Sequence, residues 1–177
     1  MEGWKKSVFF IFIIVISLCA SKICFSQFAA SEDQIKATLI YKFMSYIEWP
    51  SDSDPDSLSL CILGDNPFNG IFDTFIGKTV QNKKFNVQKL ADIYDASQCN
   101  ILFISSSEKE HLPLIFDYIK DKPILTISEV EEFCRFGGMI NFIHKDGTIG
   151  FEIAPDTANK AGIKISSHLL RLAKIIK

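Results

Sequence analysis

The sequence NILFI, residues 100–104, decides the fold of this chain, because it is a short apolar run without any alternation. Such a run is typical of a parallel strand that is buried on both faces. The three serines that follow, 105–107, indicate that the strand ends there and that a helix begins, since serine is a good helix cap. We therefore expect NILFI to be a central strand of an α/β sheet.

Strand-like and helix-like segments alternate on both sides of this run. Further strands are predicted over three segments: 58–63 (LSLCIL), 84–90 and 123–127. Helices are predicted over three others: 69–76, 108–119 and 155–161. Residues 139–144 and 148–153 flank the turn sequence Lys145-Asp146-Gly147, which predicts a β-hairpin. We predict an α/β three-layer sandwich, with a mostly parallel, Rossmann-like sheet of five or six strands and a late β-hairpin.

A helix is predicted at each end of this alternating region. Ser31 can cap a helix that runs to Pro50, and its apolar residues recur at three- and four-residue spacing over a wide face. A wide face of this kind is usually core, and a partner surface is the alternative. Ser166 can cap a final helix, with Leu169 and Leu172 on one stripe.

Residues 1–26 predict a secretory signal peptide. Lys5 and Lys6 precede the apolar run VFFIFIIVISL at 8–18, and small residues lead to cleavage between Ser26 and Gln27. The apolar run is shorter than the ~20 residues that a spanning helix needs. A signal anchor is the alternative interpretation. We therefore expect an exported, periplasmic protein whose residues 27–177 form one domain.

The composition of the mature chain argues against nucleic-acid binding. Removing residues 1–26 leaves 151 of the 177 residues, a usual size for one domain. The removed part carries three lysines and one glutamate, so the net charge falls from −2 to −4. The mature chain has no basic run.

Motifs of catalysis are missing from the sequence. The three histidines have no metal-ligand spacing, and no GxSxG, P-loop or GxGxxG sequence occurs. We therefore predict no enzyme activity, no cofactor and no metal site. The remaining catalytic alternative is a thiol nucleophile at Cys134 beside His144 or His168.

Three cysteines remain after the signal peptide is removed: Cys61, Cys99 and Cys134. In an oxidising compartment the simplest outcome is one disulfide and one free thiol. Three buried, reduced cysteines are the alternative.

Six blocks of the mature chain occur in an order that resembles the YfiR family. They are KATLIYKFMSYIEWP (36–50), LCILGDNPF (60–68), CNILFISSSE (99–108), ILTISEV (124–130), FGGMINF (136–142) with GFEI (150–153), and AGIKISSHLLRLA (161–173). The resemblance implies a small periplasmic α/β regulator that restrains a membrane-bound signalling protein, a diguanylate cyclase in the best-known member, by binding its periplasmic domain. One departure is Ala154, where the family commonly has Asn.

The resemblance also implies a disulfide between Cys61 and Cys99, which occupy positions where family members can form one. If the strands follow the order 2-1-3, the strands of these two cysteines are neighbours, and the side chains can meet. Cys134 is then left as a free thiol, or pairs between molecules.

The candidate binding residues lie in the last third of the chain. Glu152 lies in a predicted strand and needs a partner if it is buried. Either it pins the last helices by a salt bridge, or it belongs to a partner- or ligand-binding site with Lys164, Ser166, His168 and Arg171. Gly137-Gly138 indicates close backbone approach, by packing or by a ligand.

Three classes of function remain from the sequence. The leading hypothesis is a regulator that binds the periplasmic part of a membrane signalling protein through the helix over 31–49 or the segment 154–168, with a homodimer as a further option. The alternative is a periplasmic module that binds a small molecule at the carboxyl ends of the strands. An unrecognised enzyme is the third.

Overall fold

The computed structural model describes residues 30–50, 56–145 and 147–176. The predicted signal peptide lies outside these residues, so its cleavage stays a prediction. Residues from Ser31 to Lys177 form one compact unit. Among the described residues, no helix has the length and apolar character needed to cross a membrane.

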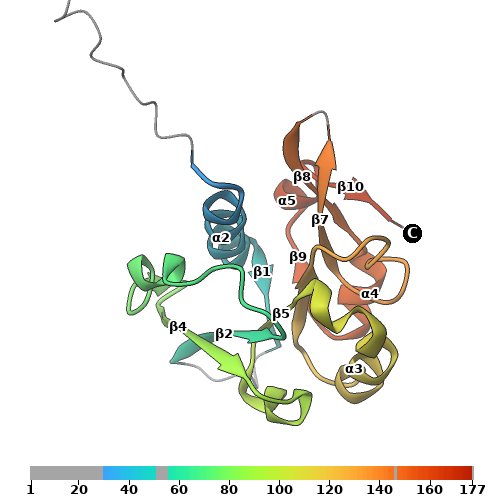
Figure 1. Cartoon of the computed structure of the whole chain (residues 1–177), viewed down its shortest axis with the longest axis horizontal. Coiled ribbons are helices and arrows are strands. Elements are labelled where there is room, and N and C mark those ends of the chain that lie inside the picture. Colours follow the sequence, from blue (N-terminus) through green and yellow to red (C-terminus); the bar gives the residue numbers. More distant parts are fainter. Residues whose placement is uncertain (1–29, 51–55, 146, 177) are drawn as a thin grey trace, which may run out of the picture. The chain divides into compact units, whose positions relative to one another are not determined.

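An eight-stranded sheet organises the domain, with the strand order β10-β8-β7-β6-β5-β2-β4-β3 (Figure 1). In chain order its strands are β2 Ser57–Leu63, β3 Thr79–Val80, β4 Lys83–Leu90, β5 Ile101–Ile104, β6 Leu125–Ser128, β7 Ile140–Lys145, β8 Thr148–Ile153 and β10 Lys174–Ile175. A separate two-stranded pairing joins β1 (Ile47–Glu48) to β9 (Lys164–Ile165).

The α/β class is as predicted, but the sheet has eight strands of mixed direction instead of five or six mostly parallel strands. Neighbours from β4 through β2, β5 and β6 to β7 pair in parallel. The antiparallel pairings are β7 with β8, which is the predicted hairpin, and β3 with β4. The extra strands β3 and β10 have two residues each, too few for an alternating pattern to predict them.

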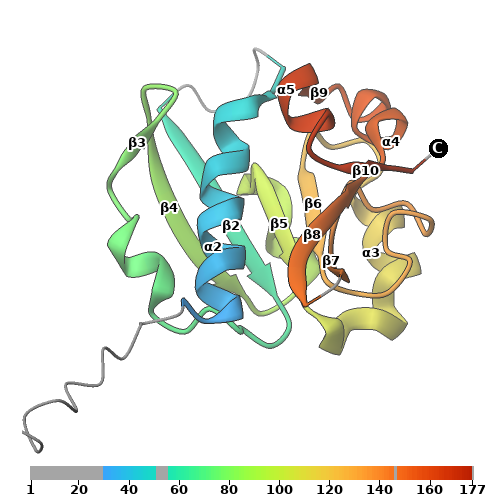
Figure 2. The same cartoon turned by 90° about the horizontal axis from the view of Figure 1, so that it is seen from above.

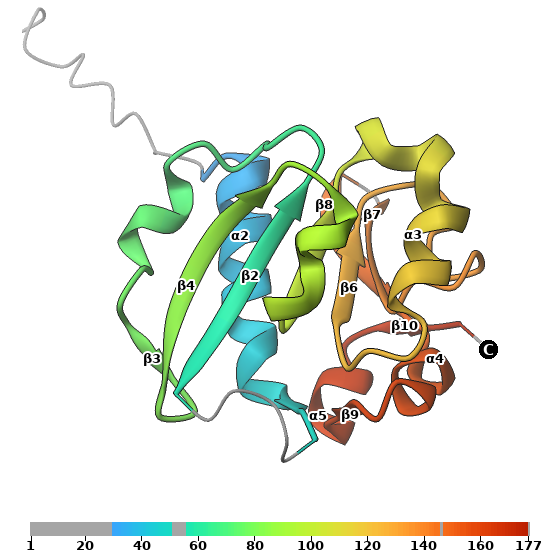
Figure 3. The ribbon, with the colours of Figure 1, turned by 90° about the horizontal axis from the view of Figure 1, so that it is seen from below.

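Both faces of the sheet are covered, and β2 shows why. Leu58, Leu60 and Ile62 belong to one buried cluster, whereas Cys61 and Leu63 belong to another. Because successive side chains of a strand point to opposite faces, the two clusters lie on opposite sides of the sheet. Helix α2 covers the first face (Figure 2), and α3 covers the second (Figure 3).

Helix α2 (Glu32–Phe43) begins at the predicted Ser31, which forms a capping box with Gln34. The helix is shorter than the predicted span of 31–49. A 3₁₀ turn, η1 (Met44–Tyr46), follows it, and the chain then enters β1 because that strand pairs with β9. The apolar face is core, as the first alternative predicted.

Lys36 is a charged residue on the buried face of α2. Its Nζ forms ion pairs with Glu32 one turn earlier and with Glu129 after β6. Burial alone would lower the pKa of Lys36, but hydrogen bonds to Glu129 and Glu32 outweigh it and raise the pKa above its ordinary value. The ion pair between Lys36 and Glu129 connects α2 to the carboxyl end of β6.

The other helices are short and several are 3₁₀ turns. They are η2 Ile71–Thr74, η3 Ile93–Gln98, η4 Ser106–His111, α3 Leu112–Ile119, α4 Pro155–Lys160 and α5 Ser167–Leu170. The predicted final helix is therefore only α5, since the residues beyond it turn to pair β10 with Glu152 and Ile153 of β8. Leu172 is consequently 66% exposed instead of lying on a helical core stripe.

Candidate functional site

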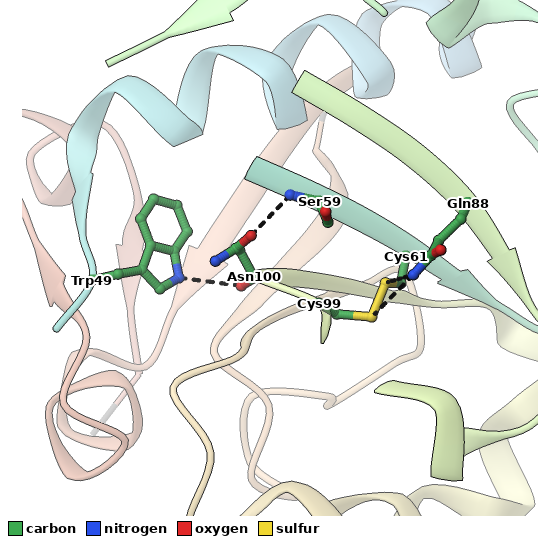
Figure 4. The surroundings of a disulfide bond; sticks show 6 residues. All are labelled: Trp49, Ser59, Cys61, Gln88, Cys99 and Asn100. Carbon is green, nitrogen blue, oxygen red and sulfur yellow. Dashed lines mark hydrogen bonds between the residues drawn. A yellow bond between two sulfur atoms is a disulfide. The ribbon is translucent and has the colours of Figure 1, made fainter. Parts of the chain in front are cut away.

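A disulfide joins Cys61 and Cys99, with their Cα atoms 5.8 Å apart (Figure 4). Cys61 lies in β2 and Cys99 lies two residues before β5, the strand that pairs with β2. Gln88 of β4 donates from Nε2 to Cys61 Sγ at 3.2 Å. Both cysteines are buried, so the bridge is a structural tie between neighbouring strands.

Asn100 connects the same region to Trp49, the residue after β1 (Figure 4). Its Oδ1 accepts from the Ser59 backbone N–H at 2.9 Å, and its carbonyl accepts from the Trp49 indole N–H at 3.2 Å. Asn100 and Trp49, which lie in two blocks quoted for the family resemblance, are therefore explained by packing and hydrogen bonding.

Cys134 is a free cysteine and is buried. Burial and the nearby negative charge of Glu152 raise the pKa of its thiol to about 12. Its thiol donates to the Glu152 carbonyl at 3.8 Å. Because a nucleophile must form the thiolate, this environment argues against the alternative of a catalytic Cys134.

Glu152 is 8% exposed and forms a salt bridge. Its Oε1 lies 2.6 Å from Nζ of Lys174, and the two residues are opposite each other in the β8–β10 register. Sequence reasoning missed Lys174 because β10 was not predicted. The salt bridge therefore pins the last strand, where we had expected a salt bridge to the last helices.

The other four candidate residues lie on the segment from β9 to the end of α5. Lys164 is exposed on β9, opposite Glu48 of β1. Ser166 caps α5 by accepting from the Leu169 N–H at 3.3 Å. The ring of His168 stacks on Tyr46, with ring centroids 5.3 Å apart, and Arg171 Nη2 lies 3.4 Å from His168 Nδ1.

The structure thus does not gather the five candidates into one pocket. Glu152 lines a pocket with Asn141 and Lys174, and none of the other four candidates lines that pocket. Lys164, Ser166, His168 and Arg171 form a surface strip instead, which we call the α5 strip.

An exposed apolar surface follows the α5 strip. Leu172 is 66% exposed and Ile175 of β10 is 40% exposed. β10 is also an edge strand, since it pairs only with β8 within the eight-stranded sheet. An edge strand with exposed apolar side chains is a usual place for another chain to bind.

A second pocket lies at the carboxyl ends of β2 and β4. It has a volume of about 620 Å³, and its polar lining residues include Asp65, Lys89, Asp92, Ser107 and Glu108. Gly64 adopts φ of +85°, and a Cβ there would lie 2.4 Å from Ser107 Oγ. Ser107 Oγ also accepts from the Asp65 N–H at 3.0 Å. Small ligands of open α/β sheets bind at this end of the strands.

Within 30–50, 56–145 and 147–176, no three His, Cys, Asp or Glu residues are arranged to hold a metal ion.

The comparison with known proteins concerns nearly all of the folded domain. The family model described as YfiR/HmsC-like matches residues 33–174, from the first turn of α2 to the start of β10. The match covers the disulfide, the buried Glu152 and the α5 strip. The chain therefore belongs to the YfiR/HmsC-like family.

Proposed function

We propose that this protein is an exported regulator that binds the periplasmic part of a membrane signalling protein and restrains it. The family match over residues 33–174 carries the proposal, since the family is one of regulatory domains. The buried disulfide supports an oxidising compartment. A diguanylate cyclase is the partner class that the family resemblance suggests.

We assign the docking surface to the α5 strip together with Leu172 and the β10 edge. Arg171 supplies exposed positive charge next to Leu172 in the chain, and Lys164 and the apolar Ile175 are exposed as well. Apolar anchors with a charged rim are typical of protein interfaces. Helix α2 contributes little, because most of its apolar face is in the core.

Site-specific photo-crosslinking tests this surface in living cells. A photoreactive residue at position 172 should form an adduct with a membrane protein that has a periplasmic domain and a cytoplasmic cyclase or kinase domain. The same residue at Tyr94, which is 60% exposed elsewhere on the molecule, serves as the control. Equal adducts from both positions, or an adduct with a soluble protein alone, would contradict the assignment.

Charge reversal tests the regulatory role itself. Arg171→Glu should release the restraint on the partner and leave the far-UV spectrum unchanged, because Arg171 is exposed. Lys84→Glu, a charge reversal at an exposed lysine of β4, should leave the restraint intact. If the partner's output stays restrained in a correctly folded Arg171→Glu protein, the α5 strip is not the docking surface.

A small-molecule binding module is the second candidate function. The pocket at the carboxyl ends of β2 and β4 favours this function, because the sequence analysis predicted a small ligand at the carboxyl ends of the strands. A metabolite that binds there should stabilise the protein by about 2.7 kcal/mol at a hundredfold excess over its Kd. Asp92→Asn should weaken the effect of that compound, and a metabolite panel without any thermal shift would exclude the module.

A further inference from the structure

A row of polar residues crosses four neighbouring strands at one level of the sheet. Ser128 of β6 is opposite Asn141 of β7, Asn141 is opposite Glu152 of β8, and Glu152 is opposite Lys174 of β10. Residues that are paired across strands point to the same face. These four side chains therefore share one face of the sheet. The polar row ends at β5, where the residue paired with Ser128 is the apolar Ile104.

Asn141 differs from the rest of this row because its buried side-chain oxygen has no hydrogen-bond partner. Ser128 Oγ donates to the Ile104 carbonyl at 2.6 Å, and Glu152 is paired with Lys174 at 2.6 Å. Asn141 is 2% exposed, and in the described part of the chain its Oδ1 accepts no hydrogen bond. Buried polar side chains are nearly always hydrogen-bonded, so an orphan acceptor indicates a missing donor.

Asn141 lines a pocket with a volume of about 440 Å³ and a negative lining. Four glutamates line the pocket: Glu129, Glu131, Glu132 and Glu152. Arg135 and Lys174 are the opposing cations, and His144 is a third basic group. With a neutral histidine the lining has a net charge of −2, or −1 when Lys36, the ion-pair partner of Glu129, is included, and this favours a cation over an anion. Three of its glutamates, Glu129, Glu131 and Glu132, follow the carboxyl end of β6.

We propose that this pocket binds the primary ammonium group of a small amine, which donates one hydrogen bond to Asn141 Oδ1 and another to the Glu152 carboxylate. An ammonium has three donors, so it can satisfy both oxygens at once. Lys174 already presents such a group to Glu152 from the rim, and its side chain is 63% exposed, so a ligand can displace it. The donor set suits an ammonium better than a metal ion, since no metal-binding cluster exists among the described residues.

Calorimetric titration of the mature protein with putrescine and with methylamine tests the proposal. Saturable binding is expected, with a Kd of about 1 mM or lower for at least one of them. Tetramethylammonium has the same charge as methylamine but no N–H donor, so it should bind about tenfold more weakly or not at all. In ¹⁵N spectra, the Asn141 side-chain amide should shift with the two amines only.

Two variants and one control connect binding to the residues. Asn141→Leu and Glu152→Gln should each weaken amine binding about tenfold or more. Asn141→Leu should melt no lower than the native chain, because the buried Asn141 Oδ1 has no hydrogen bond to lose. Asn86→Leu, a change at an exposed asparagine of β4, should leave binding unchanged.

Three results would overturn the proposal. The first is no saturable binding of either amine, the second is equal binding of tetramethylammonium, and the third is unchanged binding by a folded Glu152→Gln protein. If Asn141→Leu does not fold, the binding measurement on Glu152→Gln still tests the proposal. Failure would leave the proposed regulator intact, since the α5 strip does not line this pocket.

Discussion

At the residue scale, the disulfide is the bond whose removal should cost the most stability. Cys61 and Cys99 are 38 positions apart, and loop entropy then gives about 4 kcal/mol as an upper estimate. We expect the double change Cys61→Ala and Cys99→Ala to lower the free energy of unfolding by several kcal/mol in urea titrations.

A thiol count checks the same bond without mutation. The denatured, unreduced mature protein should show one reactive thiol, that of Cys134, and reduction should raise the number to three. Three reactive thiols before reduction, in protein taken from the periplasm, would refute the bridge.

The raised pKa of Cys134 makes stability depend on alkaline pH. The folded thiol keeps its proton up to about pH 12, whereas the unfolded thiol has the ordinary cysteine pKa of 9.0 and ionises earlier. This contribution is therefore fully present below pH 9 and is lost as the pH rises from 9 towards 12. The free energy of unfolding should fall less steeply in this range for Cys134→Ala than for the native chain. Identical slopes would show that the thiol is not protected.

At the element scale, Gly138 sets how the segment before β7 packs. A Cβ on Gly138 would lie 2.1 Å from Phe133 Cδ1, and Phe133 is fully buried. The glycine pair therefore serves packing, the first of the two interpretations of Gly137-Gly138. Gly138→Ala should lower the free energy of unfolding by about 1–3 kcal/mol, because Phe133 must move out of its position.

Gly150→Ala is the matched control for this change. Its Cβ would meet Ile143 Cγ1 at 3.4 Å, an ordinary contact. Thermal melts of the two variants should therefore differ clearly. An unchanged melting temperature for Gly138→Ala would mean that the core around Phe133 is looser than the structure describes.

At the scale of the whole molecule, export remains a prediction from residues 1–26. Mass spectrometry of the periplasmic protein should find an N-terminus within a few residues of Gln27, because the small residues before it fit a cleavage site. A soluble cytoplasmic product that retains Met1 would contradict it.

Local sequence signals predicted the elements that form from neighbouring residues. The strands around NILFI and LSLCIL, the hairpin of β7 and β8 and the α2 cap at Ser31 follow from apolar runs, turn residues and capping, which act within a few positions. The disulfide also followed, since strand order and the family resemblance both pointed to Cys61 and Cys99.

Pairing between strands that are distant in the sequence determined the features that local patterns did not predict. The strands β1, β9 and β10 have two residues each and form because a strand distant in the sequence pairs with them, whereas the equally short β3 pairs locally with β4. The partnership of Glu152 with Lys174 and the isolation of Asn141 depend on that pairing. The sequence by itself determined the α/β class, the longer strands and the family, because these rest on local patterns. Only the tertiary structure decided which polar side chains meet, because the register between strands distant in the sequence places them.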